Sequence, residues 1–202
     1  MIDLYSGSTS NGVRTTIAVV ESGLPYRFHR IDLSKGEQRT PAFLAVNPIG
    51  QIPALVDDDC EGGRLALAQS AAILIYIAEK SGTLLPRGAA AKAEAIQWVM
   101  FAASDLGPAF SAGMMLGSDK EANATAIQTM RNRATALLGQ LETRLATASH
   151  LVGDAFTIAD IAVYGNAWRM RGAGFDLSGF PNLLRWMADI ESRPGVAKAL
   201  AL

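Results

Sequence analysis

The pair Gln69–Ser70 stands at the start of a strongly helical stretch, where residue type and position could bind an anion. Serine is a preferred N-cap residue, because its hydroxyl accepts a hydrogen bond from an N–H group of the first turn. The other unpaired N–H groups and the helix dipole make this end of a helix an anion site. When the pair is taken alone, a plain cap is the more common role.

A second chemical signal is Ile52–Pro53, which follows a loop and precedes an apolar run. Proline cannot donate to a sheet ladder, so it belongs at the beginning or the edge of a strand. A cis bond here would turn the chain sharply and leave neighbouring backbone N–H and C=O groups free to pair with a peptide-like ligand. The dipeptide alone favours an ordinary trans bond, since only a small minority of such bonds are cis.

The counts of cysteine and histidine exclude other kinds of site. The single cysteine, Cys60, cannot form a disulfide within the chain or a Cys-x-x-Cys redox pair. We interpret it as incidental, because it lies in an acidic turn away from the other candidates. With only His29 and His150, a zinc site would need acidic ligands at unfavourable positions, so we expect no metal.

The charge balance argues against nucleic acid as the main partner. The chain has 202 residues and a formal net charge of −1, which leaves no basic stripe for phosphates. Its first residues are not those of a signal peptide, and its most apolar run, residues 65–78, is too short to span a bilayer. We therefore expect a cytoplasmic protein without a membrane partner.

Strand and helix signals alternate over the first eighty residues, and strand signals almost disappear after residue 82. Turn residues at 81–82 and 86–88 predict a linker over residues 82–89, between a domain of residues 1–81 and an all-helical domain of residues 90–202. In the first domain, strands are expected at 2–5, 26–33, 54–56 and 65–67 and helices at 12–22 and 70–80. In the second domain, helices are expected at 89–116 with a bend near Gly107–Pro108, at 120–149, 157–168 and 182–192, and after 193.

The segment Asp154-x-Phe156-Thr157-Ile158-Ala159-Asp160 predicts a stable helix start without chemistry. Thr157 and Asp160 have the spacing of a reciprocal capping box, with Asp in place of the usual Glu. Phe156 precedes the cap and can pack onto the first turn beside Ile161.

These ordered motifs together resemble the cytosolic glutathione transferases along the whole chain. The first residues, Met-Ile-Asp-Leu-Tyr and Ser-Thr-Ser-Asn-Gly at 8–12, are similar to bacterial nu-class members, which reduce disulfides with glutathione and lack a catalytic cysteine. Beta- and theta-like classes are the competing resemblances. The resemblance implies a thioredoxin-like α/β domain with a mixed four-stranded sheet in the order β-α-β-α-β-β-α. An all-α helical bundle would follow it and form the second-substrate pocket.

The resemblance further implies glutathione as co-substrate. Ser70 would hold the γ-glutamyl carboxylate, and Gln69, which stands where the nu class usually has Glu, would add a polar contact. The backbone of Ile52 would pair with the cysteinyl group, with Pro53 fixing the turn. The residues that stand where the family often contacts the glycyl end are Gln38 and Gln51.

The glutathione thiol is expected at the loop of residues 8–11, where a helix begins. A helix N-terminus with hydroxyl or amide donors stabilises the thiolate, which is the nucleophile. Nu-like members use a Thr and an Asn, which match Thr9 and Asn11, whereas theta-like members use a serine, for which Ser10 is the nearest candidate. Beta-class members carry a cysteine there, which this chain lacks. Without the resemblance, the loop would be a polar turn and a helix cap.

The segment Ser104-Asp105-Leu106 resembles the Ser-Glu-Leu segment of beta-class members, whose residues reach the glutathione α-amino group from the neighbouring subunit. The resemblance thus implies a homodimer with shared sites. Asp105 is a carboxylate in an otherwise apolar stretch, and it needs a partner because an unpaired buried charge is costly. The alternative is an exposed helix face or a pair with an arginine of the same chain.

The resemblance implies an enzyme that stabilises the glutathione thiolate for attack on an electrophile, as in detoxification, or on a disulfide. Two other function classes remain open. One is a non-catalytic binding or scaffold protein of the same fold. The other is a glutathione-dependent isomerase or lyase of a catabolic pathway.

Overall fold

The computed structural model describes residues 1–202, apart from the side chain of Ser118. By its internal contacts the chain divides into two compact units, and each is described by itself. The first comprises residues 1–85 and 190–202, and the second comprises residues 86–189. The division assigns residues 190–202 to the first unit, whereas the sequence places them with the helical domain. The expected linker at 82–89 stays a prediction.

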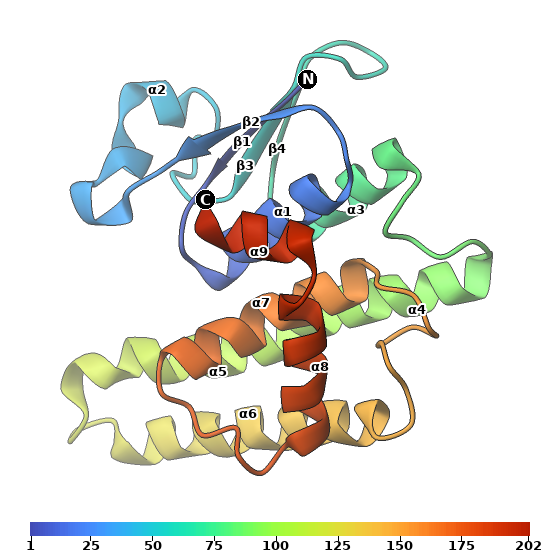
Figure 1. Cartoon of the computed structure of the whole chain (residues 1–202). Helices are drawn as coiled ribbons and strands as arrows, with labels where there is room; N and C mark the ends of the chain where they lie inside the picture. The colour runs from blue at the N-terminus through green and yellow to red at the C-terminus, as the bar shows by residue number, and fades with distance from the viewer. The chain divides into compact units, whose positions relative to one another are not determined.

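The first unit is built on a four-stranded mixed sheet in the order β2-β1-β3-β4 (Figure 1). Strand β1 is parallel to β2 and antiparallel to β3, and β3 and β4 form an antiparallel hairpin. The expected mixed sheet is therefore confirmed. The strands are β1 (Ile2–Ser6), β2 (Tyr26–Arg30), β3 (Ala54–Asp57) and β4 (Leu65–Ala68).

Two long helices follow strands of this sheet and contact each other, and their apolar residues supply the core. Ile17 of α1 and Ile73 of α3 are fully buried, as is Leu4 of β1. Helix α3 ends where Gly82 takes a left-handed conformation (φ 67°) and donates to Ala78 O, the usual helix stop at glycine. The helices of this unit are α1 (Ser10–Glu21), α2 (Pro41–Leu44), α3 (Ser70–Ser81) and α9 (Pro194–Ala201), with 3₁₀ turns η1 (Leu33–Lys35) and η2 (Glu37–Arg39) before α2.

The C-terminal helix α9 packs against α1, which explains why residues 190–202 join the first unit. Arg193 donates to Glu21 Oε2 at 2.6 Å through Nη2. A Cβ at Gly195 would lie 2.3 Å from Glu21 Oε1, so a larger residue there would have to displace the Glu21 carboxylate that Arg193 binds. Short-range sequence patterns do not reveal a pairing between residues 172 positions apart.

The fully buried carboxylate of Asp57 ties β3, α3 and the hairpin turn together. It accepts hydrogen bonds from Lys80 Nζ and Tyr76 Oη, both at 2.7 Å, and from the backbone N–H of Asp59 at 2.9 Å. Burial by itself would raise the pKa of Asp57, but the bonds from Lys80 and Tyr76 outweigh it and hold the pKa at about 2. Burial, followed by bonds to Cys60 and Asp57, raises the pKa of Tyr76.

The second unit consists of helices (Figure 1). The expected helix over residues 89–116 is interrupted by a π-helical segment at 101–106, just before Gly107–Pro108, where the sequence predicts a bend. The expected helix at 120–149 begins later, because a 3₁₀ turn precedes it. The elements are α4 (Ala89–Met100), the π-helix η3 (Phe101–Leu106), α5 (Gly107–Met115), the 3₁₀ turn η4 (Leu116–Asp119), α6 (Ala124–Leu145), α7 (Ile158–Gly172) and α8 (Pro181–Glu191).

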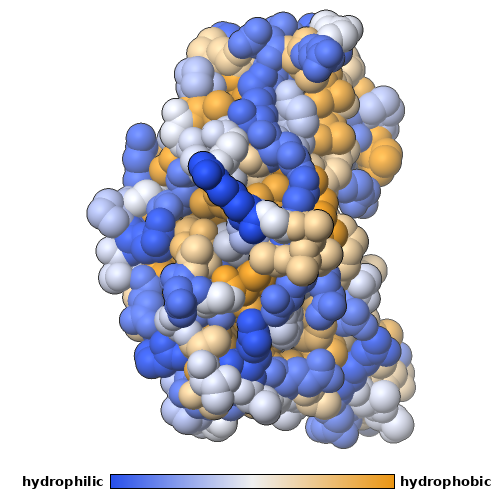
Figure 2. Space-filling model, turned by 90° about the vertical axis from the view of Figure 1, so that its right-hand side faces the viewer, coloured by the Kyte–Doolittle hydropathy of each residue, from blue (hydrophilic) through white to orange (hydrophobic). Residues whose placement is uncertain are grey.

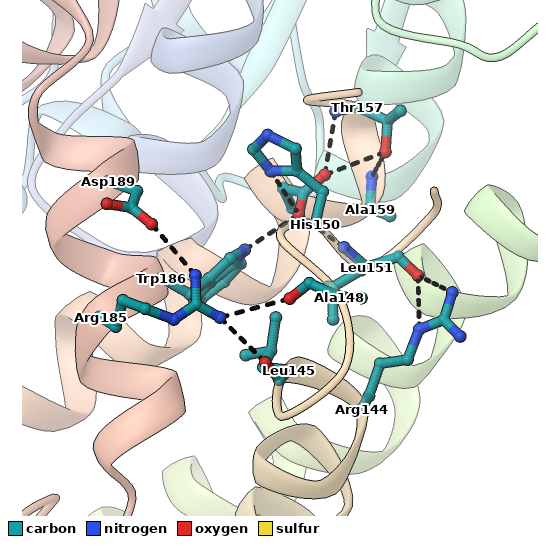
Figure 3. A network of polar contacts seen from close by, with 11 residues as sticks. Arg144, Leu145, Ala148, His150, Leu151, Thr157, Ala159, Arg185, Trp186 and Asp189 are labelled. Carbon is teal, nitrogen blue, oxygen red and sulfur yellow. Dashed lines mark hydrogen bonds and ion pairs between the residues drawn. The ribbon is translucent and has the colours of Figure 1, made fainter. Parts of the chain in front are cut away.

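The buried carboxylate of Asp160 organises the start of α7 (Figure 3). Its Oδ2 accepts from the Thr157 N–H at 3.0 Å, and the reciprocal capping box is present as predicted. Its Oδ1 accepts from the backbone N–H of Leu151 and from Trp186 Nε1, each at 3.0 Å. The motif therefore does more than cap α7, because it also joins α8 and the preceding loop to that helix.

The face drawn in Figure 2 mixes hydrophilic and hydrophobic residues over small areas. Within the part of the chain that the structure describes, no helix combines the length and apolar character needed to cross a membrane.

The buried Asp57 predicts a stability that depends on pH. Because its folded pKa, about 2, lies below the ordinary value of 3.8, its contribution is present above pH ~4 and is lost as the pH falls toward ~2. Asp57→Asn should lower the free energy of unfolding by about 3 kcal/mol at neutral pH. Urea unfolding should show that the difference in free energy of unfolding between wild type and variant becomes smaller as the pH falls from ~5 to ~2. A gap that stays constant over this range would contradict the assignment.

Candidate active site

The polar loop after β1 forms the first turn of α1. Thr9 is the N-cap residue, and its Oγ1 accepts a hydrogen bond from the Gly12 N–H at 3.0 Å. A Cβ at Gly12 would lie 2.0 Å from Gly7 O, so glycine is required for the loop to fold back this closely. Since the Thr9 hydroxyl accepts in this cap, its hydrogen stays available for an external acceptor, and the described residues give it none.

A hydrogen bond joins the predicted thiol site to the predicted carboxylate site. Ser70 Oγ, at the start of α3, donates to Asn11 Oδ1, at the start of α1, at 3.3 Å, across 59 positions of sequence. The Asn11 Nδ2 group has no acceptor among the described residues and can therefore donate outward. The two helix N-termini thus lie side by side, and both favour negative charge at one place.

The structure corrects the cap of α3. The N-cap position belongs to Gln69, and Ser70 is the first helical residue. Gln69 makes no side-chain cap hydrogen bond, so no side chain caps the first-turn N–H groups of α3. Its backbone adopts φ 72°, ψ 112°, a conformation that costs a non-glycine residue on the order of 1–3 kcal/mol and recurs at functional sites.

The Ile52–Pro53 bond is cis, the alternative that the dipeptide alone disfavoured. Ile52 lies beside the loop after β1, since a Cβ at Gly7 would approach Ile52 Cδ1 to 3.1 Å. The structure gives neither the N–H nor the carbonyl of Ile52 a hydrogen-bond partner among the residues it describes. This backbone can pair with an extended peptide ligand.

The two predicted glutamines lie on neighbouring loops. A Cβ at Gly50 would lie 3.0 Å from Gln38 O, so the turn at η2 touches the loop that leads to Ile52. The Gln51 carbonyl accepts from Asn47 Nδ2 at 2.7 Å, which holds that loop, while the Gln51 side chain is exposed. The Oε1 atom of Gln38 is buried, and no protein group bonds to it among the described residues. A buried acceptor oxygen without a donor is costly, so Gln38 Oε1 fits an N–H or O–H donor of an external ligand.

The sequence reasoning missed a buried cation behind the polar loop. Arg14 of α1 is 1% exposed, and its Nε donates to the Ser10 carbonyl at 3.3 Å. Desolvation by burial lowers the pKa of Arg14 to about 10, so the guanidinium stays charged at neutral pH. The Ser10 side chain is half-buried and makes no hydrogen bond among the described residues. A buried arginine in an apolar helical stretch was the available signal, because such a charge needs a structural or functional reason.

Two residues discussed in the sequence analysis are not among those described above, namely Asp105, a predicted site residue, and Cys60, which was interpreted as incidental. Asp105 belongs to the second unit, within η3, where its Oδ1 is 3.3 Å from Arg133 Nη2. Its side chain is 42% exposed, so it is not a buried charge, and it has the arginine partner considered as the alternative. Cys60 is in the hairpin turn, where Sγ contacts Glu61 O. Among the described residues there is no cluster of His, Cys, Asp and Glu that could hold a metal ion.

Two family models and several known proteins match this chain in sequence. The family model described as "Glutathione S-transferase, N-terminal domain" matches residues 1–79, and the corresponding "C-terminal domain" model matches residues 124–189. Two similar Escherichia coli proteins are called disulfide-bond oxidoreductases. YfcG is 37% identical, over 99% of this chain and 94% of its own length, and YghU is 32% identical, over 98% and 73%.

Solved structures of known proteins are also similar to this chain over nearly its whole length. A glutathione transferase from Burkholderia graminis, with two glutathione molecules bound per subunit, has a TM-score of 0.90 and 37% identity, over 98% of this chain and 87% of that chain. One from Pseudomonas putida, with one glutathione disulfide bound per subunit, has a TM-score of 0.88 and 32% identity, over 98% and 90%.

The backbone of Gln69 predicts a gain of stability on substitution. Gln69→Gly should raise the free energy of unfolding by about 1 kcal/mol, because glycine adopts a positive φ without steric cost. Urea unfolding measures the change. Gln51→Gly, at a position without a positive φ, is the control and should be neutral or destabilising by about 0.5–1 kcal/mol. Equal loss of stability in both variants would contradict strain at Gln69.

Proposed function

The chain belongs to the glutathione S-transferase family, and we propose that this enzyme reduces disulfides with glutathione. The observation that carries the proposal is the hydrogen bond between Ser70 and Asn11, which sets two helix N-termini at one place. One can hold the γ-glutamyl carboxylate of glutathione and the other the thiolate of the adjacent cysteinyl residue.

Glutathione would lie along the three loops of the first unit. Its γ-glutamyl carboxylate would bind the open N-terminus of α3, with contacts from Ser70 and Gln69. Its cysteinyl backbone would pair with the unpartnered N–H and C=O of Ile52, where Pro53 sets the turn. The glycyl N–H could then donate to the unpartnered Gln38 Oε1, and the glycyl carboxylate would reach the exposed side chain of Gln51.

Thiolate stabilisation is the chemical task of the site. The hydroxyl hydrogen of Thr9 and the amide of Asn11 are donors without protein acceptors, and the dipole of α1 adds positive potential. Ser10, at the first helical position, is the remaining candidate donor. Each favours the charged form of a bound thiol and lowers its pKa, which raises the thiolate fraction at neutral pH.

The reaction is thiol–disulfide exchange. The glutathione thiolate attacks one sulfur of the substrate disulfide, an S–S bond forms, and the other sulfur leaves as a thiolate that takes a proton. A second glutathione thiolate attacks the mixed disulfide. Two glutathione molecules are thus oxidised to glutathione disulfide, and the substrate is reduced to two thiols. No cysteine of the chain is needed in either step.

The relatives support disulfide exchange over transfer to an electrophile. Two of them are called disulfide-bond oxidoreductases, one bound structure holds glutathione disulfide, and another holds two glutathione molecules in each subunit. Two thiols or one disulfide at one subunit is the stoichiometry that the exchange requires. A lone cysteine also fits a reducing compartment such as the cytoplasm, where glutathione is kept reduced.

We also infer a homodimer in which Asp105 binds the α-amino group of the glutathione held by the neighbouring subunit. The supporting observation is a partly exposed carboxylate with defined orientation. Arg133 holds Asp105 Oδ1, and Oδ2 lies 3.3 Å from Ser104 Oγ, whose single hydrogen goes to Met100 O at 2.7 Å. A carboxylate has about four acceptor positions, so it can still accept from an ammonium.

Loss of the Thr9 hydroxyl tests the proposal. Thr9→Val should lower kcat/KM for glutathione-dependent reduction of a small disulfide about 10- to 100-fold and shift the pH profile upward, because a donor to the thiolate is lost. Thr9→Ser, which keeps the hydroxyl, should retain most of the activity. Cys60→Ser should be fully active. Normal activity in Thr9→Val, or inactivity in Cys60→Ser, would refute this mechanism.

A further inference from the structure

We propose that Asn166 is a positioning residue for Asp105, because its side chain fixes the π-helical turn that presents the carboxylate. The inference rests on the proposed function, in which Asp105 binds the glutathione α-amino group. Both residues belong to the second unit, Asn166 in α7 and Asp105 in η3.

The π-helical turn leaves backbone groups that a regular helix would pair. The Gly107 N–H donates to Ala102 O, a bond that spans five residues instead of four. Pro108 has no N–H, so the chain cannot return to the regular pattern through the next residue. Asn166, 2% exposed, donates through Nδ2 to the same Ala102 O at 2.7 Å. The amide thereby supplies a second donor at the carbonyl where the turn widens.

Glycine at position 107 suits the close backbone approach of this turn. A Cβ at Gly107 would lie 2.9 Å from Ala102 O, which is too close, and 3.5 Å from Asn166 Oδ1, which is an ordinary contact. A side chain at this position would therefore disturb the Ala102 carbonyl to which Asn166 donates. A π-helical turn contains one residue more than an α-helical turn. The Gly107 N–H and the Asn166 side chain both donate to the Ala102 carbonyl, and together they fix where this extra residue lies.

The position of that extra residue decides where Asp105 points. Successive residues of an α-helix are rotated by about 100°, so moving the extra residue across Asp105 would turn its side chain to another face. Its present direction lets Oδ1 meet Arg133 of α6 at 3.3 Å and places Oδ2 3.3 Å from Ser104 Oγ. Ser104 is itself held by its bond to Met100 O at 2.7 Å. Without the Asn166 bond, this arrangement loses its support.

A substrate pair separates positioning from mere stabilisation. One member is glutathione, and the other is glutaryl-cysteinyl-glycine, which lacks only the α-amino group. Calorimetric titration of the full chain with each gives a ratio of dissociation constants that reports contact with that amino group. Wild type should prefer glutathione by about tenfold or more, the range of a charge-assisted hydrogen bond. A loss of stability alone does not change this ratio in the folded protein.

Four variants complete the experiment. Asp105→Asn tests the proposed contact itself, and Asn166→Asp replaces the donor by an acceptor of the same shape. Gly107→Ala disturbs the same turn from the other side and serves if Asn166→Asp does not fold. The control is Asn182→Ala, which removes another side-chain bond of this unit, from Nδ2 to Glu142 Oε1 at 2.7 Å, far from the turn in sequence.

The expected result is a ratio near one to twofold for Asp105→Asn, Asn166→Asp and Gly107→Ala, with the wild-type ratio kept in Asn182→Ala. Asp105→Asn combined with Asn166→Asp should lower the ratio no further. A low ratio in Asp105→Asn with wild-type ratios in both Asn166→Asp and Gly107→Ala would overturn the positioning role alone. An unchanged ratio in Asp105→Asn would overturn the contact and, with it, this inference.

Discussion

The hydrogen bond from Ser70 to Asn11 is the contact on which the site depends, because it joins two helix N-termini. Helix α1 follows β1 and α3 follows β4, and the sheet order places these strands on either side of β3. The dipoles of both helices therefore direct partial positive charge to one place. The buried guanidinium of Arg14 adds to it. The site thus attracts anions although the net charge of the chain is −1.

In the proposed mode of binding, backbone groups would do most of the recognition, which explains why so few side chains identify the site. The first turn of α3 lacks a side-chain cap, and Ile52 has an N–H and a carbonyl without partners among the described residues. Glycines at 7 and 12 allow the close approach of the loops that carry these groups. Fixed backbone donors need little reorganisation when a ligand binds, so they stabilise charge efficiently.

The sequence predicted those features whose causes are local. The Thr157–Asp160 capping box follows from residue spacing, and it is present. The mixed sheet, which the family resemblance implied, is present as well. Features that depend on distant contacts were not predictable in the same way. Gln69 replaces Ser70 as N-cap, the π-helical turn relies on Asn166 of another helix, and α9 packs on α1 through Arg193. The roles of the site residues toward glutathione remain predictions, because they concern a ligand and a second subunit.

The most direct measurement is calorimetric titration of the protein with reduced glutathione and then with glutathione disulfide. If the adjacent N-termini of α1 and α3 serve thiol–disulfide exchange, the disulfide should bind, and more tightly than the thiol. Ser70→Ala should weaken the binding of both. Binding of the thiol alone would contradict disulfide reduction and favour transfer to electrophiles. Binding of neither would contradict the assignment of a glutathione-dependent site.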